Sequence, residues 1–391
     1  MAAASQAPSG LDTDPTAYLA LPRFNNTLDF TFAGQPATAT YALTAAPPGG
    51  AWPVLIFFNG LGGHRLIAAM IEGIASAHRV QILTVDKPGA GGSARGVSLP
   101  LAHRTRWMHA ALLAVLAHTR TTRFAVLSHS NGLFYALHTL LHLPPALTAT
   151  RWTLSGPFVP PALSGSAALR LAAALPAPLP NALGALLQVV PPLGRAVSWS
   201  GGLLAAVSPG PALDAEATEQ RKPAAQRGYM HRHVGGACRA AIMRRGMGEA
   251  RVAMGQEALF CLHGADPAPD AEGGGDSVWG LGPGTSAADV LHSAFARLAA
   301  RYPDDALGVR VVYGAADGMV PAKGRAWLRG VLEGAGLLRG ADAWREVPGA
   351  GHDDVLFLEE VVGAILGRVG EAEPGRVGGE ELGSVDESGG D

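Results

Sequence analysis

Continuous apolar runs, separated by stretches of helical periodicity, define the architecture that this chain predicts. Runs of this kind are typical of strands that are buried on both faces of a sheet. The longest cover residues 53–58, 80–85, 124–127 and 308–313, and shorter strand-like segments cover 152–154 and 344–347. Helical patterns lie between most of them, which predicts a mostly parallel sheet with helices on both faces. The predicted fold class is therefore α/β.

The two ends of this pattern differ from its middle. Residues 28–33 and 37–43 alternate apolar and polar positions around a Gly-Gln-Pro turn, which predicts an antiparallel hairpin. After the last strand, residues 355–367 predict a single amphipathic helix. We expect Asp353 and Asp354 to cap this helix, because carboxylates suit the positive end of a helix dipole.

The middle of the chain has a different composition. Residues 157–262 are dominated by alanine, leucine and proline, and several prolines interrupt their helical periodicity. Such a segment cannot supply long sheet strands, so we predict a helical lid that lies over the sheet. The α/β core then consists of residues 27–156 and 286–370, with a Ser-Ala-Ala-Asp capping box that opens a helix at Ser286.

Three further segments are predicted to lie outside the core. Residues 1–26 are rich in Ala, Pro and Ser and are expected to be poorly ordered. Residues 263–285 are rich in Gly, Pro and Asp and predict a surface loop. Residues 371–391 carry seven acidic side chains and one arginine and predict a disordered acidic tail.

Length, charge and cysteine content narrow the functional classes. With 391 residues, 48% of them hydrophobic, the chain can bury a substantial core. Its formal net charge of −2 argues against a general nucleic-acid binder. Cys238 and Cys261 lack the spacing of a zinc site or a disulfide framework. No apolar run reaches the roughly 18 residues of a membrane span, and the N-terminus lacks a signal-peptide pattern, so we expect a cytoplasmic protein.

One charged region stands out inside the predicted lid. Between Arg221 and Arg251 there are eight basic residues and one acidic residue. A solvated helix face accounts for such a stretch. The alternative interpretation is that it attracts an anionic substrate or binds the acidic tail.

The strongest chemical signal is a serine at a sharp turn from strand to helix. The segment Ser128-His129-Ser130-Asn131-Gly132 follows a buried strand, and a helical pattern begins directly after it. Such a turn needs small neighbours and holds the Ser130 hydroxyl above the sheet edge, where a base and a substrate can reach it. The base is needed because a serine hydroxyl is nearly un-ionised at neutral pH.

Two later strand ends supply the partners that such a serine requires. Asp317 lies just beyond the predicted strand 308–313, and His352 lies just beyond the strand 344–347. Because the carboxyl ends of parallel strands meet at one edge of a sheet, we expect both side chains near Ser130. A histidine that is held in the right tautomer by a carboxylate can accept the serine proton.

These motifs make the sequence similar to the α/β-hydrolase fold serine hydrolases, the esterase and lipase superfamily with a lid. The nucleophile elbow of that family is normally Gly-x-Ser-x-Gly, and Ser128 takes the place of its first glycine here. Asp86-x-Pro-Gly-x-Gly-x-Ser93 resembles the family's turn after the second parallel strand. The resemblance covers residues 28–156 and 286–369.

The resemblance also implies an oxyanion hole. Asn59-Gly60 resembles the His-Gly motif of the family's oxyanion loop, with asparagine in place of histidine. By this likeness, the backbone N–H groups of Leu61 and Asn131 would form the oxyanion hole. Since backbone groups donate, the asparagine need not abolish the function.

Two other residues compete for roles in the site. Asp86 is the alternative acid, but it precedes Ser130, whereas this architecture uses the chain order Ser, Asp, His. His129 is expected to be a structural neighbour rather than the base, because adjacent side chains in an elbow point apart. We therefore expect Ser130 as nucleophile, His352 as base and Asp317 as the acid that orients it.

The expected activity is hydrolysis of a small-molecule carboxylic ester, thioester or amide through an acyl-enzyme. This mechanism requires neither a metal nor an organic cofactor. Acyl transfer to another alcohol, or a lyase reaction on the same triad, is the alternative within enzymes. A catalytically silent binding module is the alternative from another class. The sequence does not predict the acyl chain, the leaving group or the oligomeric state.

Overall fold

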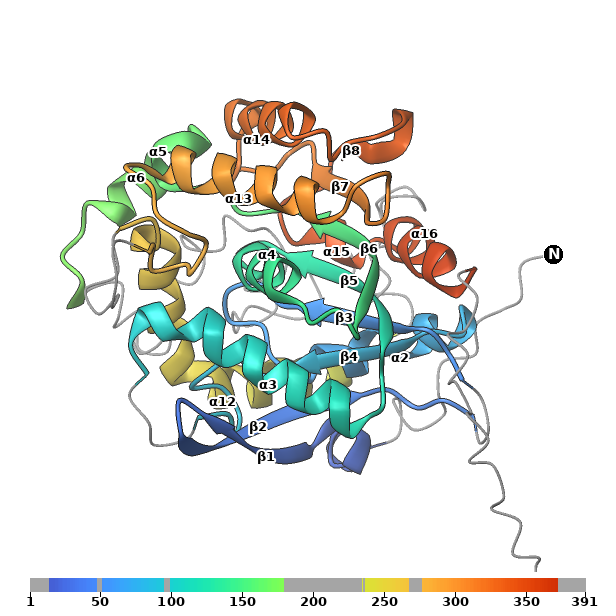
Figure 1. Cartoon of the computed structure of the whole chain (residues 1–391). Helices are drawn as coiled ribbons and strands as arrows, with labels where there is room; N and C mark the ends of the chain where they lie inside the picture. The colour runs from blue at the N-terminus through green and yellow to red at the C-terminus, as the bar shows by residue number, and fades with distance from the viewer. Residues whose placement is uncertain are drawn as a thin grey trace, which may run out of the picture.

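Eight strands form one sheet in a computed structural model that describes residues 14–47, 51–94, 99–178, 234, 236–266 and 276–371. The strands are β1 Asn26–Phe32, β2 Gln35–Leu43, β3 Val54–Phe58, β4 Gln81–Val85, β5 Arg123–His129, β6 Thr148–Ser155, β7 Gly308–Gly314 and β8 Trp344–Val347. Their order across the sheet is β1-β2-β4-β3-β5-β6-β7-β8 (Figure 1). β2 is antiparallel to β1 and β4, and the remaining neighbours are parallel. The predicted α/β class and N-terminal hairpin are thus confirmed.

The central strands are buried because both faces of the sheet are covered. Every residue of β3 is buried, and so is every residue of β5 except its first, Arg123. β6 extends over eight residues, whereas the sequence predicted only 152–154. Its β-branched threonines suit the half-buried positions of a pleated strand that pairs on both sides, although they interrupt the apolar run.

Helices cover the two faces as separate layers. One hydrophobic core joins the sheet to α3, α4, α13 and α14, and a second core joins its other face to α2, α15 and α16 (Figure 1). The helices are α1 Pro15–Leu19, η1 Pro22–Phe24, α2 Ile67–Ala77, η2 Leu101–His103, α3 Arg104–His118, α4 Gly132–His142, α5 Pro161–Ser164, α6 Ala167–Ala173, α12 Gly236–His263, α13 Ala287–Arg301, α14 Ala322–Gly334, η5 Ala341–Ala343, α15 Asp354–Phe357 and α16 Glu359–Gly370. At α13, Ser286 Oγ accepts a hydrogen bond from the N–H of Asp289, as the predicted capping box requires.

The closing helix is two helices, and the prediction of one continuous helix was wrong. α15 and α16 are separated at Leu358, whose backbone is extended with ψ 127°. Residues 355–358 are four consecutive apolar residues, and all four are buried. Consecutive residues of one helix point to different faces, so the break allows the whole run to be buried.

The N-terminal segment is partly ordered, against the expectation for residues 1–26. Residues 1–13 lie outside the described part of the chain, but α1 and η1 follow directly. The Asp14 carboxylate caps α1 by accepting from the N–H groups of Thr16 and Ala17. Tyr18 and Phe24 are buried against the sheet, and this apolar burial gives the segment a reason to fold.

The predicted lid segment contributes α5, α6 and α12, while residues 179–233 lie outside the described residues. α12 is built into the body of the protein, because Phe260 joins one hydrophobic core and Ile242 the other. Within the basic stretch 221–251, only the part from 234 onward is described. There Arg245 donates to the Leu19 carbonyl and the Asn25 side chain, so it ties α12 to the N-terminal segment.

The segment 263–285 was predicted to be a surface loop, and its described part differs from that. Residues 267–275 lie outside the described residues, but Val278, Trp279 and Leu281 are buried. Trp279 stacks on Phe134 of α4 with ring centroids 4.2 Å apart. These apolar side chains fold the end of the loop onto the core, although its Gly, Pro and Asp content indicated a solvated loop.

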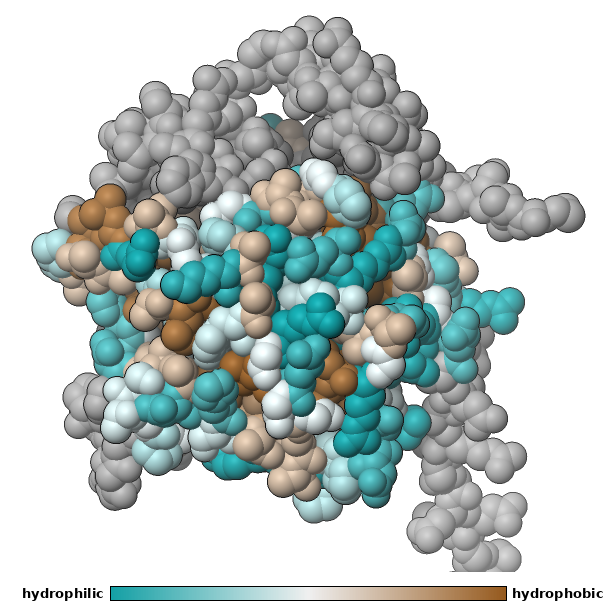
Figure 2. Space-filling view, turned by 90° about the horizontal axis from the view of Figure 1, so that it is seen from above, coloured by the Kyte–Doolittle hydropathy of each residue, from teal (hydrophilic) through white to brown (hydrophobic). Residues whose placement is uncertain are grey.

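The surface seen over α13 and α14 is mixed. Figure 2 shows hydrophobic side chains on this face in small separate groups among hydrophilic ones. Across the described ranges, none of the helices combines the length and apolar character that crossing a bilayer requires. The acidic tail, residues 372–391, lies outside the described part of the chain.

Candidate active site

Ser130 sits in a turn whose backbone is under strain. β5 ends at His129 and α4 begins at Gly132, so only two residues connect strand and helix. Ser130 has φ 51°, in the left-handed region that non-glycine residues rarely adopt. Its N–H donates to the Ser155 carbonyl of β6 at 3.2 Å, and its carbonyl accepts from Phe158. Strain that is held by surrounding bonds in this way is typical of functional sites.

Two glycines allow other chain segments to approach this turn. A Cβ on Gly132 would lie 2.2 Å from the carbonyl oxygen of Phe58, so no side chain fits between α4 and the end of β3. A Cβ on Gly60 would lie 3.0 Å from the Cβ of Ser130. The loop after β3 therefore runs directly beside the serine, which is the place that an oxyanion loop needs.

Ser128 replaces the first glycine of the elbow and has a partner of its own. Trp152 of β6 donates from its indole Nε1 to Ser128 Oγ at 2.9 Å. Both side chains are buried. The serine thus satisfies the only hydrogen-bond donor of a buried indole, which explains how the position accommodates a residue larger than glycine.

The three residues that sequence reasoning selected as a triad lie in one chain of hydrogen bonds. His352 Nε2 lies 3.0 Å from Ser130 Oγ, and His352 Nδ1 lies 2.7 Å from Asp317 Oδ2. All three residues are buried. The other oxygen of Asp317, Oδ1, accepts from the N–H groups of Met319 and Val320 at 2.9 and 2.8 Å. The carboxylate is therefore fixed with its free oxygen toward the imidazole.

The surroundings of His352 raise its affinity for a proton. Burial by itself lowers the pKa of this imidazole, but the hydrogen bond that His352 donates to Asp317 and the charges of Asp317 and Asp353 outweigh burial, so the pKa of His352 lies above its ordinary value. An imidazolium formed at this position would be stabilised by the buried carboxylate. The arrangement can accept a proton from Ser130 and hold it.

The loop after β3, which was predicted to be the oxyanion loop, is held by Asn59, the residue that stands in place of the family's usual histidine. Asn59 Nδ2 donates to Thr84 Oγ1 at 2.8 Å, which joins the end of β3 to β4. Among the described residues, the N–H groups of Leu61 and Asn131 have no protein acceptor. Asn131 is also the residue that precedes the first turn of α4, where backbone N–H groups and the helix dipole favour negative charge.

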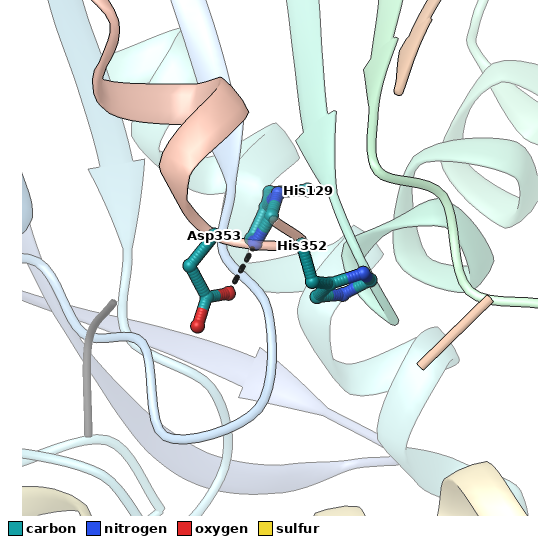
Figure 3. Close-up of side chains that lie close together, drawn as sticks. All are labelled: His129, His352 and Asp353. Carbon is teal, nitrogen blue, oxygen red and sulfur yellow. Dashed lines mark hydrogen bonds and ion pairs between the residues drawn. The ribbon is translucent and has the colours of Figure 1, made fainter. Parts of the chain in front are cut away.

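His129 and Asp353 form a second histidine–carboxylate pair beside the triad. His129 Nε2 lies 2.9 Å from Asp353 Oδ1 (Figure 3). His129 Nδ1 lies 2.9 Å from the Ser155 carbonyl. The rings of His129 and His352 are 5.2 Å apart. Both ring nitrogens of His129 therefore face partners other than Ser130. Asp353 occupies the N-cap position of α15, as expected, but its side chain makes no capping hydrogen bond to that helix.

Asp354 also lies at the N-terminal end of α15, as expected, and it has a further partner outside that helix. It is the first residue of α15, and its Oδ2 accepts from the N–H of Gly351 at 2.9 Å. The loop that carries His352 is thereby closed on itself. Both carboxylates thus lie at the start of α15, as expected, and hydrogen bonds join them to His129 and to the loop that carries His352.

Asp86, the alternative acid, is engaged elsewhere. Its Oδ1 accepts from the backbone N–H of Arg65 at 2.7 Å, and its Oδ2 accepts from the Arg65 guanidinium and from Thr40. Ser93 at the end of the same turn accepts from the N–H of Thr40 at 2.9 Å. The Asp86–Ser93 turn therefore braces β2 against the loop after β3 and supplies no acid to His352.

Sequence reasoning missed a buried ionic cluster next to the oxyanion loop. Lys87 Nζ lies 2.8 Å from Glu257 Oε2, and Arg104 Nε lies 2.9 Å from Glu257 Oε1. Tyr135 of α4 also donates to Glu257. A single glutamate in the apolar second half of α12 was the available signal, but the basic stretch before it dominated the pattern.

A metal ion could find three ligands in this region. Ring nitrogens of His129 and His352 and an oxygen of Asp353 lie within 4.8 Å of one another. The nitrogens of His129 and His352 and the Asp353 oxygen already form hydrogen bonds. To bind a metal, His352 would have to give up its hydrogen bond to Ser130 or to Asp317. The hydrogen-bond arrangement therefore suits proton transfer better than metal binding.

Comparisons with known proteins place this architecture. No family model and no curated protein matches the sequence. The structure is similar to that of a candidate lipase from Acinetobacter baumannii AYE, with TM-score 0.51 and 13% identity over 92% of this chain and 97% of the other. It is also similar to a thermophilic esterase from Thermogutta terrifontis, with TM-score 0.48 and 14% identity over 87% and 96% of the two chains. At these identities the likeness concerns architecture, and together with the sheet order it shows that this chain has the α/β-hydrolase fold.

Proposed function

We propose that the protein is a serine hydrolase that cleaves a carboxylic ester, thioester or amide through an acyl-enzyme. The observation that carries this proposal is the buried chain of hydrogen bonds from Ser130 Oγ through His352 to Asp317. Three residues from separate strand ends meet in the order that nucleophilic acyl transfer requires. Solved structures of this fold that are named as esterases or lipases are consistent with the proposal but do not carry it.

In the first half-reaction, Ser130 Oγ attacks the acyl carbon while its proton moves to His352 Nε2. The imidazolium is stabilised by Asp317, which keeps Nδ1–H directed at Oδ2. The negative charge that develops on the acyl oxygen lies against the N–H groups of Leu61 and Asn131 in this scheme. His352 then gives its proton to the leaving oxygen, sulfur or nitrogen, and the acyl group stays on Ser130.

The second half-reaction repeats these steps with water as the nucleophile. His352 accepts a proton from the water as it attacks the acyl carbon, and it returns this proton to Ser130 Oγ as the ester bond breaks. The products are a carboxylic acid and the regenerated enzyme. The same geometry would serve another alcohol in place of water, so the acceptor is a separate question from the nucleophile.

A panel of p-nitrophenyl esters of different chain length tests the proposal. Turnover by the wild type, with loss of activity in Ser130→Ala and in His352→Ala, is the expected result. A burst of p-nitrophenol equal to the enzyme concentration would identify the acyl-enzyme. Turnover that is undiminished in Ser130→Ala would contradict the assignment of the nucleophile.

A further inference from the structure

The ionic cluster of Lys87, Arg104 and Glu257 is a deeply buried group of charges that the proposed mechanism does not use. Glu257 belongs to α12, Arg104 begins α3, and Lys87 lies in the turn after β4. The side chains of Lys87, Arg104 and Glu257 are 3%, 0% and 1% exposed. Burying charges is costly unless they are paired and hydrogen-bonded. The pairing of Lys87 and Arg104 with Glu257 offsets this cost.

Glu257 remains ionised over the whole working pH range. Burial raises its pKa, but the charges of Lys87 and Arg104 and the hydrogen bonds from Lys87 and Tyr135 outweigh burial and lower the pKa of Glu257 to about 2. The lowered pKa favours the anionic form of Glu257, which pairs with Lys87 and Arg104.

Lys87 binds the peptide unit between Gly60 and Leu61, whose N–H is the first proposed oxyanion donor. Lys87 Nζ donates to the Gly60 carbonyl oxygen at 2.9 Å. This carbonyl and the N–H of Leu61 belong to one peptide unit, and no peptide bond in the described chain is cis. In a trans peptide the C=O and N–H point in opposite directions, so holding the carbonyl sets the direction of the Leu61 N–H. A cation on the carbonyl also strengthens the N–H as a donor.

Lys87 and Glu257 both bind the side chain of Asn131, whose backbone N–H is the second proposed oxyanion donor. Asn131 Oδ1 accepts from Lys87 Nζ at 3.1 Å, and Asn131 Nδ2 donates to Glu257 Oε2 at 2.8 Å. The whole carboxamide is therefore fixed by the Lys87–Glu257 ion pair. Since the N–H of Asn131 is the other proposed oxyanion donor, the Lys87–Glu257 ion pair contacts both segments that border the proposed oxyanion hole: the Gly60 carbonyl, which also accepts from the Gly63 N–H, and Asn131 through its side chain.

We infer that Lys87 and Glu257 are positioning residues that assemble the oxyanion hole, and that α12 takes part in catalysis by supplying Glu257. This inference rests on the proposed function, because it assigns a role in the same reaction. α12 is fixed against the loops after β3 and β4, where Gly62 lies against Met254 and Gly89 against Ala253. A helix of the predicted lid segment is thereby connected to the reacting centre through one carboxylate.

A purely structural role makes a different prediction, and one residue of the same helix provides the control. Glu249 also lies on α12 and forms ion pairs with Arg65 and Arg245, two turns before Glu257. It makes no contact with Leu61, Asn131 or Lys87 among the described residues. If the ion pairs of α12 only stabilise the fold, Glu249→Gln and Glu257→Gln should affect the reaction alike.

The decisive variant is Lys87→Met. It leaves Arg104 and Glu257 as a balanced pair, so the buried charge stays compensated and the protein is expected to fold. We expect kcat for ester hydrolysis to fall about 10²–10³-fold, the effect of losing one oxyanion donor. KM should stay within about threefold, because the oxyanion contact forms in the transition state and not in the ground state. The rate of phosphonylation of Ser130 by a fluorophosphonate should fall in parallel.

Glu257→Gln is the second variant, and it should show the same loss of kcat. Glu249→Gln should react within about threefold of the wild type. Thermal unfolding followed by circular dichroism checks that each variant is folded. The acid limb of the pH–rate profile should not move in Lys87→Met, because neither Lys87 nor Glu257 sets the pKa of His352.

The outcomes separate this inference from the proposed function. A wild type that is labelled on Ser130, together with Lys87→Met and Glu257→Gln variants that react within about threefold of it, would overturn the inference and leave the proposed function standing. An equal loss in Glu249→Gln would likewise overturn it in favour of a structural role. A wild type that neither hydrolyses esters nor reacts with the fluorophosphonate would overturn both.

Discussion

Two histidine–carboxylate pairs lie side by side at the edge of the sheet, and they differ in what the second ring nitrogen faces. In the pair of His352 and Asp317, the remaining nitrogen faces the Ser130 hydroxyl at 3.0 Å. In the pair of His129 and Asp353, the remaining nitrogen faces the Ser155 carbonyl at 2.9 Å. A hydroxyl can give up a proton, whereas a carbonyl can only accept a hydrogen bond. The same residue types therefore give one pair whose histidine can take a proton from a hydroxyl and one whose histidine faces no such proton.

The comparison shows that neighbours in sequence can have opposite roles. His129 precedes Ser130, and Asp353 follows His352, so the Ser130–His352 contact and the His129–Asp353 contact cross the same gap between the elbow and the loop after β8. His129 and Asp353 hold that gap closed, and Ser130 and His352 exchange a proton across it in our proposal. The four predictions below test this division of roles.

We expect the largest difference in kcat between variants of the two histidines, His352 and His129. His352→Ala removes the base and should lower kcat by about 10⁵–10⁶-fold, because the nucleophile then has no proton acceptor. His129→Ala should lower kcat by less than about tenfold, since it removes a bond that only joins segments. Steady-state ester hydrolysis measures both. Equal losses in the two variants would erase the distinction between the pairs.

Substitution of Asp317 should lower kcat more than substitution of Asp353, and this difference should be smaller than that between the two histidines. Asp317→Asn should lower kcat by about 10⁴-fold, because the amide no longer holds the productive tautomer of His352. Asp353→Asn keeps an oxygen and a donor beside His129 and should stay within about tenfold of the wild type. If Asp353→Asn proves as damaging as Asp317→Asn, Asp353 acts on the reaction and the second pair is not only structural.

The pH dependence of the reaction tests how the charge of Asp353 acts on the pKa of His352. Only the neutral form of His352 can accept the Ser130 proton, so activity is lost as pH falls through its pKa. Because that pKa lies above the ordinary value, the acid limb of kcat/KM should lie above about pH 6.5. Asp353→Asn removes one of the charges that raise this pKa and should move the limb to lower pH. An unmoved limb would show that Asp353 does not act on His352.

The smallest effect on activity is expected from His129→Gln, whose cost should appear in stability. Loss of a charge-assisted hydrogen bond should lower the free energy of unfolding by about 1–3 kcal/mol. Urea unfolding measures this value, and ester hydrolysis of the folded variant measures any chemical role. A loss of more than about 100-fold in kcat with unchanged stability would contradict the structural assignment of His129.

Much of the fold was predictable because each strand carries its own signal. Runs such as Val54–Phe58 and the alternation of β1 and β2 reflect which faces are buried, and local patterns record this directly. The positions of Ser130, Asp317 and His352 after strand ends were predictable for the same reason, since a parallel sheet brings its carboxyl ends together. The distances between these three side chains could not be predicted from the sequence and are known from the structure.

The features that sequence reasoning missed depend on contacts between distant segments. Nothing near Glu257 in the sequence indicates that Lys87, 170 residues earlier, would be its partner. The break at Leu358 was hidden because residues 355–358 satisfy a helical pattern and a buried run equally well. Asp353 resembled a helix cap, and only the position of His129 beside it shows its actual partner.

The most direct test of the central claim is to locate a fluorophosphonate adduct by peptide mass spectrometry. The proposal predicts a single adduct on Ser130 in the wild type and in His129→Ala, no adduct in Ser130→Ala, and strongly slowed labelling in His352→Ala. An adduct on another residue, or labelling that persists in Ser130→Ala, would contradict it.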